Sequence, residues 1–224
     1  MYRNTRTVRS YVFSLQVSFS EPRTRRSFQK GSPCPKSRSF GKVTSDFFEK
    51  YDIQKFENDI PTENFDCGDE DLNDFIKNEV QFFKQQLIAM PYVVVEKDKT
   101  DRILAYFTLA NDKIAVTDFE SNSQFNKFKR KNFNKEKYLR SYPSVKIGRL
   151  GISTGLQGNG IGTNIIDFIK LYFLEDNKTG CRFVTVDAYN AAVSFYEKNG
   201  FEFLTKKDDN PTQLMFFDLI NLKM

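Results

Sequence analysis

The body of the chain alternates between runs of aromatic and β-branched residues, which predict strands, and apolar repeats at helical spacing. Tyr51–Phe56 predicts the first strand, and Asp69–Leu87 predicts a helix. Pro91–Glu96 and Arg102–Leu109 predict a hairpin around a short polar turn. The apolar residues that share one face of the predicted helix are Leu72, Phe75, Ile76, Val80 and Phe83.

The second half of the chain continues this alternation. Val145–Ser153 predicts a central strand, and the amphipathic helix that follows ends at residues 177–180. After a further strand and helix, Phe201–Leu204 and Gln213–Leu219 complete a mixed sheet. Strands that alternate with helices predict an α/β layered domain. The apolar positions of the long helix are Ile165, Ile166, Phe168, Ile169, Tyr172 and Phe173.

The stretch from Leu150 to Thr163 is the most informative, because a short apolar strand runs into a glycine-rich turn that opens a helix. A helix N-terminus has unpaired backbone N–H groups and about half a positive charge, so it stabilises an anion. Gly158, Gly160 and Gly162 permit close backbone approach and positive φ. Their spacing is neither the dinucleotide fingerprint nor a Walker loop. The pattern predicts a phosphate-binding turn, with an ordinary strand-to-helix turn as the alternative.

A second block, Val184–Phe201, predicts a buried strand followed by a short helix. Asn190 stands where it would cap this helix, and Gly200 stands where the helix would stop. Tyr196 lies within the helix beside Phe195. The pattern alone leaves Tyr196 open to two interpretations, a core aromatic residue and a chemical role.

Together the two blocks resemble the GNAT superfamily of acyl-CoA-dependent N-acyltransferases. The motif Q/R-x-x-G-x-G/A of that family matches Gln157 to Gly162, and its N-x5-Y-x3-G-F matches Asn190 to Phe201. The resemblance implies a GNAT domain over residues 46–224, with a mixed, mostly antiparallel central sheet flanked by helices. It further implies transfer of the acetyl group of acetyl-CoA to a primary amine of unknown identity, without a metal. Dimers are common in this family, but the sequence leaves open whether this chain forms a homodimer. A cytoplasmic location is expected.

The resemblance also implies roles for individual residues. Tyr196 aligns with the tyrosine that acts as general acid on the CoA sulfur, and Ile152 presents its backbone N–H to the thioester carbonyl. Asn190 either caps its helix or touches pantetheine. The general base is not assigned, and is either a carboxylate acting through water or no dedicated group. The cofactor-binding residues are Leu150, Ile152, Gln157, Gly158, Asn159, Gly160, Ile161, Gly162, Thr163 and Asn190, with Gly158 to Thr163 cradling the pyrophosphate and Gln157 shaping the turn.

Composition excludes several other kinds of enzyme. The 224 residues include no histidine, which removes Ser-His-Asp and Cys-His mechanisms and every histidine-ligated metal site. The three cysteines, Cys34, Cys67 and Cys181, are far apart and odd in number. That arrangement favours free thiols in a reducing compartment over a protein held together by disulfides. No apolar run approaches the length of about 18 residues that a membrane span requires, so no contact with a membrane is expected.

Residues 1–45 differ in composition from the rest of the chain. They hold ten basic residues and one acidic residue, Glu21, whereas the remaining residues hold 24 basic and 28 acidic groups. An Arg- and Ser-rich segment with scattered Pro and Gly predicts an extension without a core. Three interpretations stay open for it: a nonessential extension or upstream translation start, an arm that binds nucleic acid or an anionic surface, and an organelle transit peptide.

Two features bear on the identity of the acceptor. Phe65 to Ile76 resembles the F-x-C-G-x-x-x-L-x-x-F/W-L opening of the GNAT branch that includes toxins acetylating aminoacyl-tRNA. Residues 111–142 form a long polar segment, and its core, residues 128–140, mixes basic groups with aromatic rings, as RNA-binding surfaces do. A solvated insertion loop has the same composition, so a tRNA contact through 128–140 is one of two interpretations. A module that binds acyl-CoA without turnover is the alternative to an enzyme, and the sequence does not say whether an antitoxin partner exists.

Overall fold

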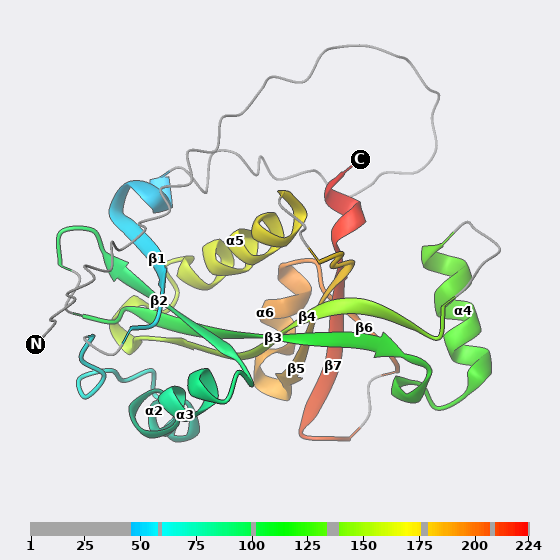
Figure 1. The fold of residues 1–224 in the computed structure, drawn as a ribbon, viewed down its shortest axis with the longest axis horizontal. Coiled ribbons are helices and arrows are strands. Elements are labelled where there is room, and N and C mark those ends of the chain that lie inside the picture. Colours follow the sequence, from blue (N-terminus) through cyan, green and yellow to red (C-terminus); the bar gives the residue numbers. More distant parts are fainter. Residues whose placement is uncertain are drawn as a thin grey trace, which may run out of the picture. The chain divides into compact units, whose positions relative to one another are not determined.

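The computed structural model describes residues 46–57, 60–99, 102–133, 139–175, 179–206 and 209–223. The basic extension predicted over residues 1–45 lies outside these ranges. The centre of the described part is a seven-stranded sheet in the order β1-β2-β3-β4-β5-β7-β6 (Figure 1). The pair β4 and β5 is parallel, and the other neighbouring strands are antiparallel. The prediction of a mixed, mostly antiparallel sheet flanked by helices is therefore confirmed.

The predicted elements occur in the predicted order. Two strands are longer than expected: β3, which was predicted to end at Leu109, and β4, which was predicted to begin at Val145. The strands are β1 (Tyr51–Lys55), β2 (Met90–Glu96), β3 (Ala105–Ala115), β4 (Ser141–Ile152), β5 (Phe183–Tyr189), β6 (Glu202–Phe203) and β7 (Thr212–Asp218). The helices are α2 (Glu70–Asp74), α3 (Val80–Gln85), α4 (Asn122–Asn132), α5 (Ile161–Glu175) and α6 (Val193–Lys198). A short helix over residues 46–50 precedes β1.

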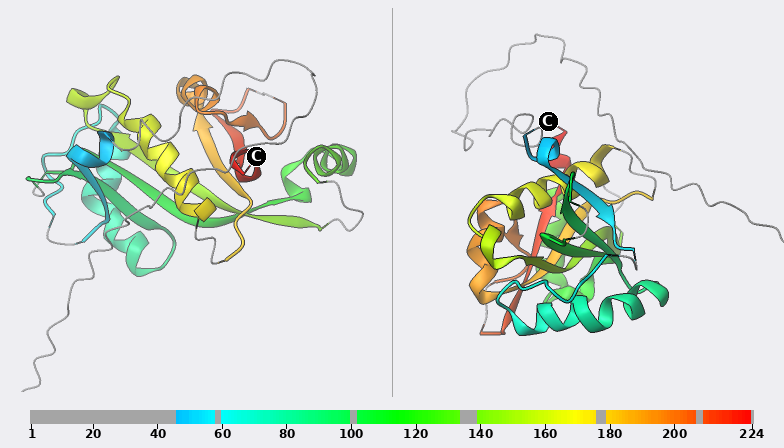
Figure 2. Two further views of the ribbon diagram at one scale, coloured as in Figure 1. Left: turned by 90° about the horizontal axis from the view of Figure 1, so that it is seen from above. Right: turned by 90° about the vertical axis from the view of Figure 1, so that its left-hand side faces the viewer.

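Helices cover both faces of the sheet. Figure 1 shows α5 on one side and α2 with α3 on the other, and Figure 2 shows the same layers from two further directions. The core on the α5 side includes Ile147, Ile165 and Val186, and α6 packs into the same core. Because side chains alternate between the faces of a strand, Lys146 and Asp187 belong to the opposite face. No helix in the described part of the chain is long and apolar enough to cross a membrane.

The helix predicted from Asp69 begins where expected. The Asp69 side chain accepts a hydrogen bond from Leu72 N (3.0 Å), which caps the first turn. The middle of the helix, Phe75–Glu79, is π-helical, so the regular spacing of the predicted face is interrupted there. The helix ends slightly early, at Gln85.

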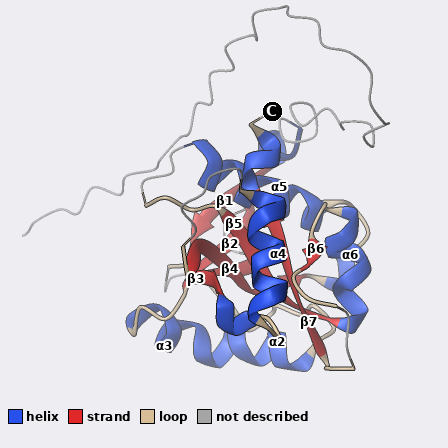
Figure 3. Cartoon of the chain, turned by 90° about the vertical axis from the view of Figure 1, so that its right-hand side faces the viewer, coloured by secondary structure: helices blue, strands red, loops and turns tan. Residues whose placement is uncertain are grey.

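The polar segment 111–142 holds a helix that the sequence interpretation missed. The strand β3 continues to Ala115, and α4 covers the far end of the long β3–β4 hairpin (Figure 3). Phe125 and Phe128 of α4 are buried, and the Phe128 ring lies against aromatic rings of β5 and β7. The interpretation of a solvated loop is therefore wrong for α4, because apolar contacts with distant strands outweigh its basic composition.

Candidate active site

The strands β4 and β5 pair briefly and then diverge within the sheet. Parallel pairing covers Ser144–Ile147 of β4 and Phe183–Val186 of β5. Beyond these residues β4 remains paired with β3, and β5 remains paired with β7. The register of β4 against β3 shifts between Thr108 and Leu109, which makes Gly148 the extra residue of a β-bulge. This bulge lies where β4 and β5 separate, a point called the vertex below. The divergence therefore leaves one edge of each strand without a strand partner.

Beyond the bulge, backbone N–H groups of β4 face the side that β5 has left. The N–H groups of Ser153 and Arg149 donate toward β3, to the carbonyl before its first residue and to a threonine hydroxyl on it. Alternate residues of a strand direct their N–H groups to opposite sides. The N–H groups of Leu150 and Ile152 therefore point into the divergence, with Leu150 closer to its vertex.

A glycine-rich turn connects β4 to α5 and is exposed over residues 157–160. Gly158 and Gly160 have φ values of 80° and 79°, a conformation that strains any residue with a side chain. Asn164 N is the first donor of α5 to bond back along the helix, to Gly160 O at 3.1 Å. The N–H groups of Ile161–Thr163 thus have no acceptor within the helix. The turn presents an open helix N-terminus to solvent, which suits an anion.

Gly162 has a different role from the other two glycines. It lies within α5, and a Cβ atom there would lie 3.0 Å from Ile152 Cδ1 and 3.1 Å from the Phe195 ring. Its missing side chain therefore lets α5 pack closely against α6. Packing therefore explains why position 162 is a glycine, while its backbone N–H stays among the unpaired donors at the start of α5.

The side chain of Gln157 connects the glycine turn to the segment before α2. Its Nε2 donates to Cys67 O (2.8 Å) and to Ile152 O (3.0 Å). Thr154 N donates in turn to Asp66 O (3.0 Å). The F-x-C-G segment, residues 65–68, therefore stabilises the turn that follows β4 through these hydrogen bonds.

Tyr196 lies on α6 and its side chain is 6% exposed. The ring packs edge-on against Phe195 and Phe201, and among the described residues no partner holds its hydroxyl. Burial raises the pKa of Tyr196 above its usual range, so the phenol is protonated at neutral pH. Because Phe195 covers Gly162, the Tyr196 helix lies beside the open N-terminus of α5.

Asn190 does not cap the helix that follows it. Its Nδ2 donates to Asn210 O (2.9 Å), and α6, which begins at Val193, has no side-chain cap. The expected cap is therefore wrong, because the side chain instead holds the loop before β7. Gly200 ends α6 as predicted, with a φ of 81° and its N–H bonded to Glu197 O at 2.9 Å.

Charged side chains that the sequence did not single out flank the divergence on the α2–α3 face. Lys146 and Asp187 form an ion pair at the vertex, and Asp187, the first residue of β5 beyond the parallel pairing, has a side chain that is 45% exposed. Arg149 lies 3.9 Å above the Phe75 ring centroid, and its Nη2 is 3.9 Å from a carboxylate oxygen of Glu79. Strand alternation is the only sequence signal that could have placed Lys146 and Asp187 on one face.

The helix α4 brings basic groups to the surface but keeps its rings inside. Phe128 is 8% exposed, and Phe133 stacks on a tyrosine ring of β4 with centroids 4.1 Å apart. The expectation that aromatic rings of this segment are available to unpaired bases is therefore wrong for Phe128, whereas Phe133 is half-buried. Lys127 and Arg130 are exposed, whereas residues 134–138 lie outside the described residues.

Residues 138–213 match the family model described as an acetyltransferase (GNAT) domain. This stretch therefore carries a GNAT acetyltransferase domain. The matched region contains the glycine turn, α5, β5 and α6, which are the elements that build the site described above. The protein is accordingly an acetyltransferase.

Solved structures with a similar fold extend the comparison to most of the chain. AtaT in complex with acetyl-methionyl-tRNAfMet is 24% identical, with a TM-score of 0.61 over 77% of this chain and 97% of AtaT. A tyrosine-to-phenylalanine mutant of KacT is 24% identical, with a TM-score of 0.59 over 78% of this chain and 98% of KacT. AtaTR bound with AcCoA is 23% identical, with a TM-score of 0.60 over 78% of this chain and 97% of that one. These likenesses show that the GNAT fold extends well beyond residues 138–213.

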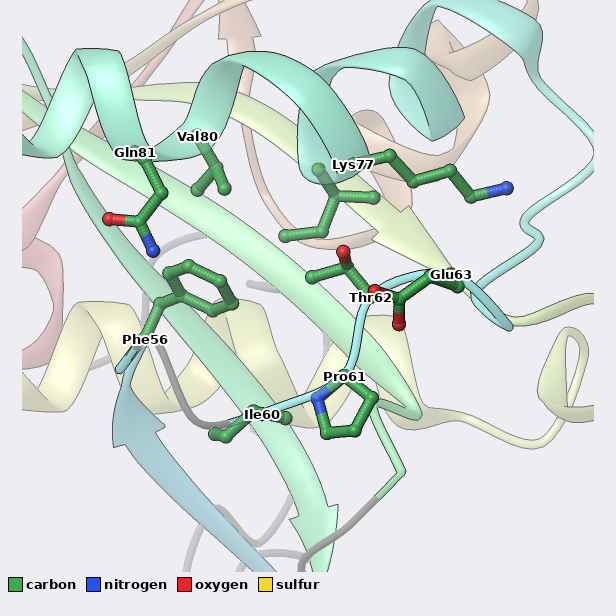
Figure 4. A pocket seen from close by; sticks show the side chains of 9 residues that line it. Phe56, Ile60, Pro61, Thr62, Glu63, Lys77, Val80 and Gln81 are labelled. Carbon is green, nitrogen blue, oxygen red and sulfur yellow. The ribbon is translucent and has the colours of Figure 1, made fainter.

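A hollow of about 420 Å³ lies away from the GNAT motifs, between the segment after β1 and the α2–α3 face (Figure 4). Its apolar lining includes Phe56, Ile60 and Val80, and its charged lining residues are Lys77 and Glu63. None of the site residues expected from the sequence lines it. Among the described residues no group of three or more His, Cys, Asp or Glu side chains could hold a metal ion.

Proposed function

We propose that this GNAT domain transfers the acetyl group of acetyl-CoA to the primary amine of an aminoacyl-tRNA. The observation that carries the cofactor part is the divergence of β4 and β5 next to the open N-terminus of α5. Pyrophosphate would bind the N–H groups of Gly158 to Thr163, with Gln157 fixing the turn. The N–H groups of Leu150 and Ile152 would bind the thioester arm and its carbonyl oxygen.

Acetyl transfer requires one bond to form and one to break. The neutral amine attacks the thioester carbon, the carbon–sulfur bond breaks, the nitrogen loses a proton and the sulfur leaves as a thiolate. A thiol has a pKa near ~8.5 and a phenol near ~10, so a protonated tyrosine stabilises the thiolate by donating a hydrogen bond. We assign this role to Tyr196, whose hydroxyl is left without a partner by the described residues.

The amine would approach from the α2–α3 face, because α5 and α6 cover the other face of the divergence. An amine of this class is partly protonated at neutral pH, with a pKa near ~7.7–8.0 for an α-amino group. Asp187 is the exposed carboxylate at the vertex on that face. We propose that Asp187 accepts the proton that the amine releases, directly or through water, and that Lys146 holds its carboxylate in place.

Replacing Asp187 by Asn tests this assignment. We expect kcat/KM to fall by roughly 10² near neutral pH, since general-base help is worth at least that much. The loss should shrink as pH rises, because more of the amine is then already neutral in solution. A pH–rate profile of acetyl transfer measures this. Asp112→Asn is the matched control, since Asp112 lies on the same face and accepts a hydrogen bond from Thr185 that Asn can keep. An equal loss at every pH would contradict the assignment.

The acceptor class rests on the likeness to AtaT bound to acetyl-methionyl-tRNAfMet and on the exposed basic side chains of α4. Because the α4 rings are buried, the contact would be with phosphates through cations rather than with stacked bases. Among the described residues, the proposed contact therefore moves from the region 128–140 expected from the sequence to the outer face of α4, which overlaps that region at residues 128–132.

Charge reversal on α4 tests the RNA contact. In the double variant Lys127→Glu and Arg130→Glu, we expect weaker tRNA binding and a slope of log K against log salt reduced by about 1 to 2. The affinity for acetyl-CoA should stay unchanged. The double variant Lys50→Glu and Lys55→Glu is the control, because both lysines are exposed near β1, at the opposite edge of the sheet. Filter binding over a range of salt concentrations measures both, and equal effects in the two double variants would remove the α4 contact.

The experiment that tests the function as a whole is transfer of label from acetyl-CoA by the full chain to mixed aminoacyl-tRNA, peptides and small amines. Label on aminoacyl-tRNA supports the proposal. Label only on a peptide or a small amine overturns the proposed acceptor class but supports acetyltransferase activity. Binding of acetyl-CoA with no transfer to any acceptor would favour a non-catalytic acyl-CoA-binding module. Light scattering of the same sample tests whether the chain forms a homodimer.

A further inference from the structure

Lys170 is a lysine buried in the core between α5 and α6. Its side chain is 3% exposed, on the face of α5 that packs on the sheet. Burial lowers its pKa to about 8, against the opposing effect of Asp167, whose carboxylate oxygen lies 3.7 Å from Lys170 Nζ. Lys170 therefore carries its positive charge in a buried position that disfavours it. A methionine would fill a similar volume without the free-energy cost of burying a charge.

The contacts of Lys170 are concentrated at the C-terminal end of α6. Its Nζ donates to Asn199 O (2.6 Å), the carbonyl that follows the last residue of the helix. The same Nζ lies 4.1 Å from the centroid of the Phe217 ring and 5.7 Å from that of Phe201. Asn199 is itself 8% exposed. Lys170 thus supplies a donor, inside the core, to the end of a helix of six residues.

The helix α6 contacts α5 at two points, one before Tyr196 in the sequence and one after it. One point is Phe195 against Gly162, in the first turn of α5. The other is Asn199 against Lys170, eight residues and about 12 Å farther along α5. Because a helix of six residues has little stability of its own, these two contacts, together with the packing of Val193 and Tyr196 in the core, set where its residues lie relative to α5.

We propose that Lys170 is a positioning residue that holds Tyr196 at a fixed place relative to the phosphate-binding end of α5. The inference rests on the proposed role of Tyr196 as the acid. The Lys170 side chain is 3% exposed, so it acts by fixing the end of α6 through Asn199 O and not by contact with cofactor or acceptor. Its loss should therefore affect the step that uses the Tyr196 hydroxyl, and leave the binding of acetyl-CoA unaffected.

The test compares the full-length protein with Lys170→Met, Tyr196→Phe and the double variant. The readouts are turnover in acetyl transfer to mixed aminoacyl-tRNA, or to the amine that accepts label in the panel above, the Kd of acetyl-CoA and urea unfolding. For Lys170→Met we expect kcat to fall roughly tenfold to a hundredfold, the size of effect that a small misplacement of a reacting group produces. The Kd should stay the same, and the free energy of unfolding should fall, because Asn199 O and the Asp167 carboxylate lose a partner in the core. In the Tyr196→Phe background the same substitution should have little further effect, because the hydroxyl that it misplaces is absent.

Lys198→Met is the matched control, because Lys198 is an exposed lysine of the same helix. It should leave kcat unchanged. If Lys170→Met does not unfold cooperatively, Lys170→Gln replaces it under the same criteria. Unchanged kcat in the Lys170 variant, or a full additional loss in the Tyr196→Phe background, overturns this inference and leaves the acid assignment intact. Normal turnover of Tyr196→Phe alone overturns the acid assignment itself, and this inference with it.

Discussion

Tyr196→Phe is expected to lower kcat by about 10² to 10⁴ while leaving the Kd of acetyl-CoA unchanged, because the missing hydroxyl helps only the departing sulfur. The ring remains, and with it the packing against Phe195 and Phe201. Since no described residue holds the hydroxyl, its removal should not lower the free energy of unfolding. Steady-state kinetics, calorimetry with acetyl-CoA and urea unfolding separate the three quantities.

The control for this variant is Tyr51→Phe, which removes a hydroxyl from β1 at the far edge of the sheet. Its turnover should match that of the parent. The acid role of Tyr196 is contradicted by normal turnover, and also by a slow variant whose entire defect lies in weaker binding of acetyl-CoA.

Gly160→Glu is expected to weaken acetyl-CoA binding by at least about 10², because a carboxylate would stand against the pyrophosphate. Gly160 is exposed in the turn before α5, its φ is 79°, and a Cβ there would meet no atom within 4 Å. The new side chain therefore has room in the fold, and the left-handed backbone should cost only about 1–2 kcal/mol of stability. Isothermal calorimetry and urea unfolding measure the two effects.

Two further variants separate charge from backbone strain. Gly160→Ala has the same φ and no carboxylate, so it should lose the same stability and much less affinity. Gly155→Glu places the same charge in the preceding turn, at a glycine with open space and no positive φ, and should retain most of the affinity. If Gly155→Glu and Gly160→Glu weaken binding equally, the pyrophosphate does not sit at the N-terminus of α5.

Hydrophobic spacing predicted the order of strands and helices because each prediction depended on residues close together in the chain. The same holds for the Asp69 cap, the stop at Gly200 and the turn at Gly158 and Gly160, where backbone conformation follows from the residue itself. These features were available from one sequence because their physical causes act over a few residues.

Local spacing failed where a distant partner competed for a side chain. Asn190 had the sequence position of a cap, but its amide bonds the carbonyl of Asn210. Phe125 and Phe128 lay among basic residues, yet their burial against β5 and β7 makes a helix of that segment. In each case the contact joins residues 20 or more positions apart, so composition around the residue gave the wrong environment.

The amino-acid sequence by itself determined the fold class, the glycine turn and the tyrosine helix, since these depend on short-range periodicity, glycine conformation and the spacing within each block. Tertiary structure alone decided that Gly162 serves packing, that Asp187 and Lys146 meet at the vertex between β4 and β5, and that Lys170 reaches the end of α6. The physical reason is that strand register, burial and long-range hydrogen bonds fix these neighbours, and they exist only once the sheet and its helices have packed together.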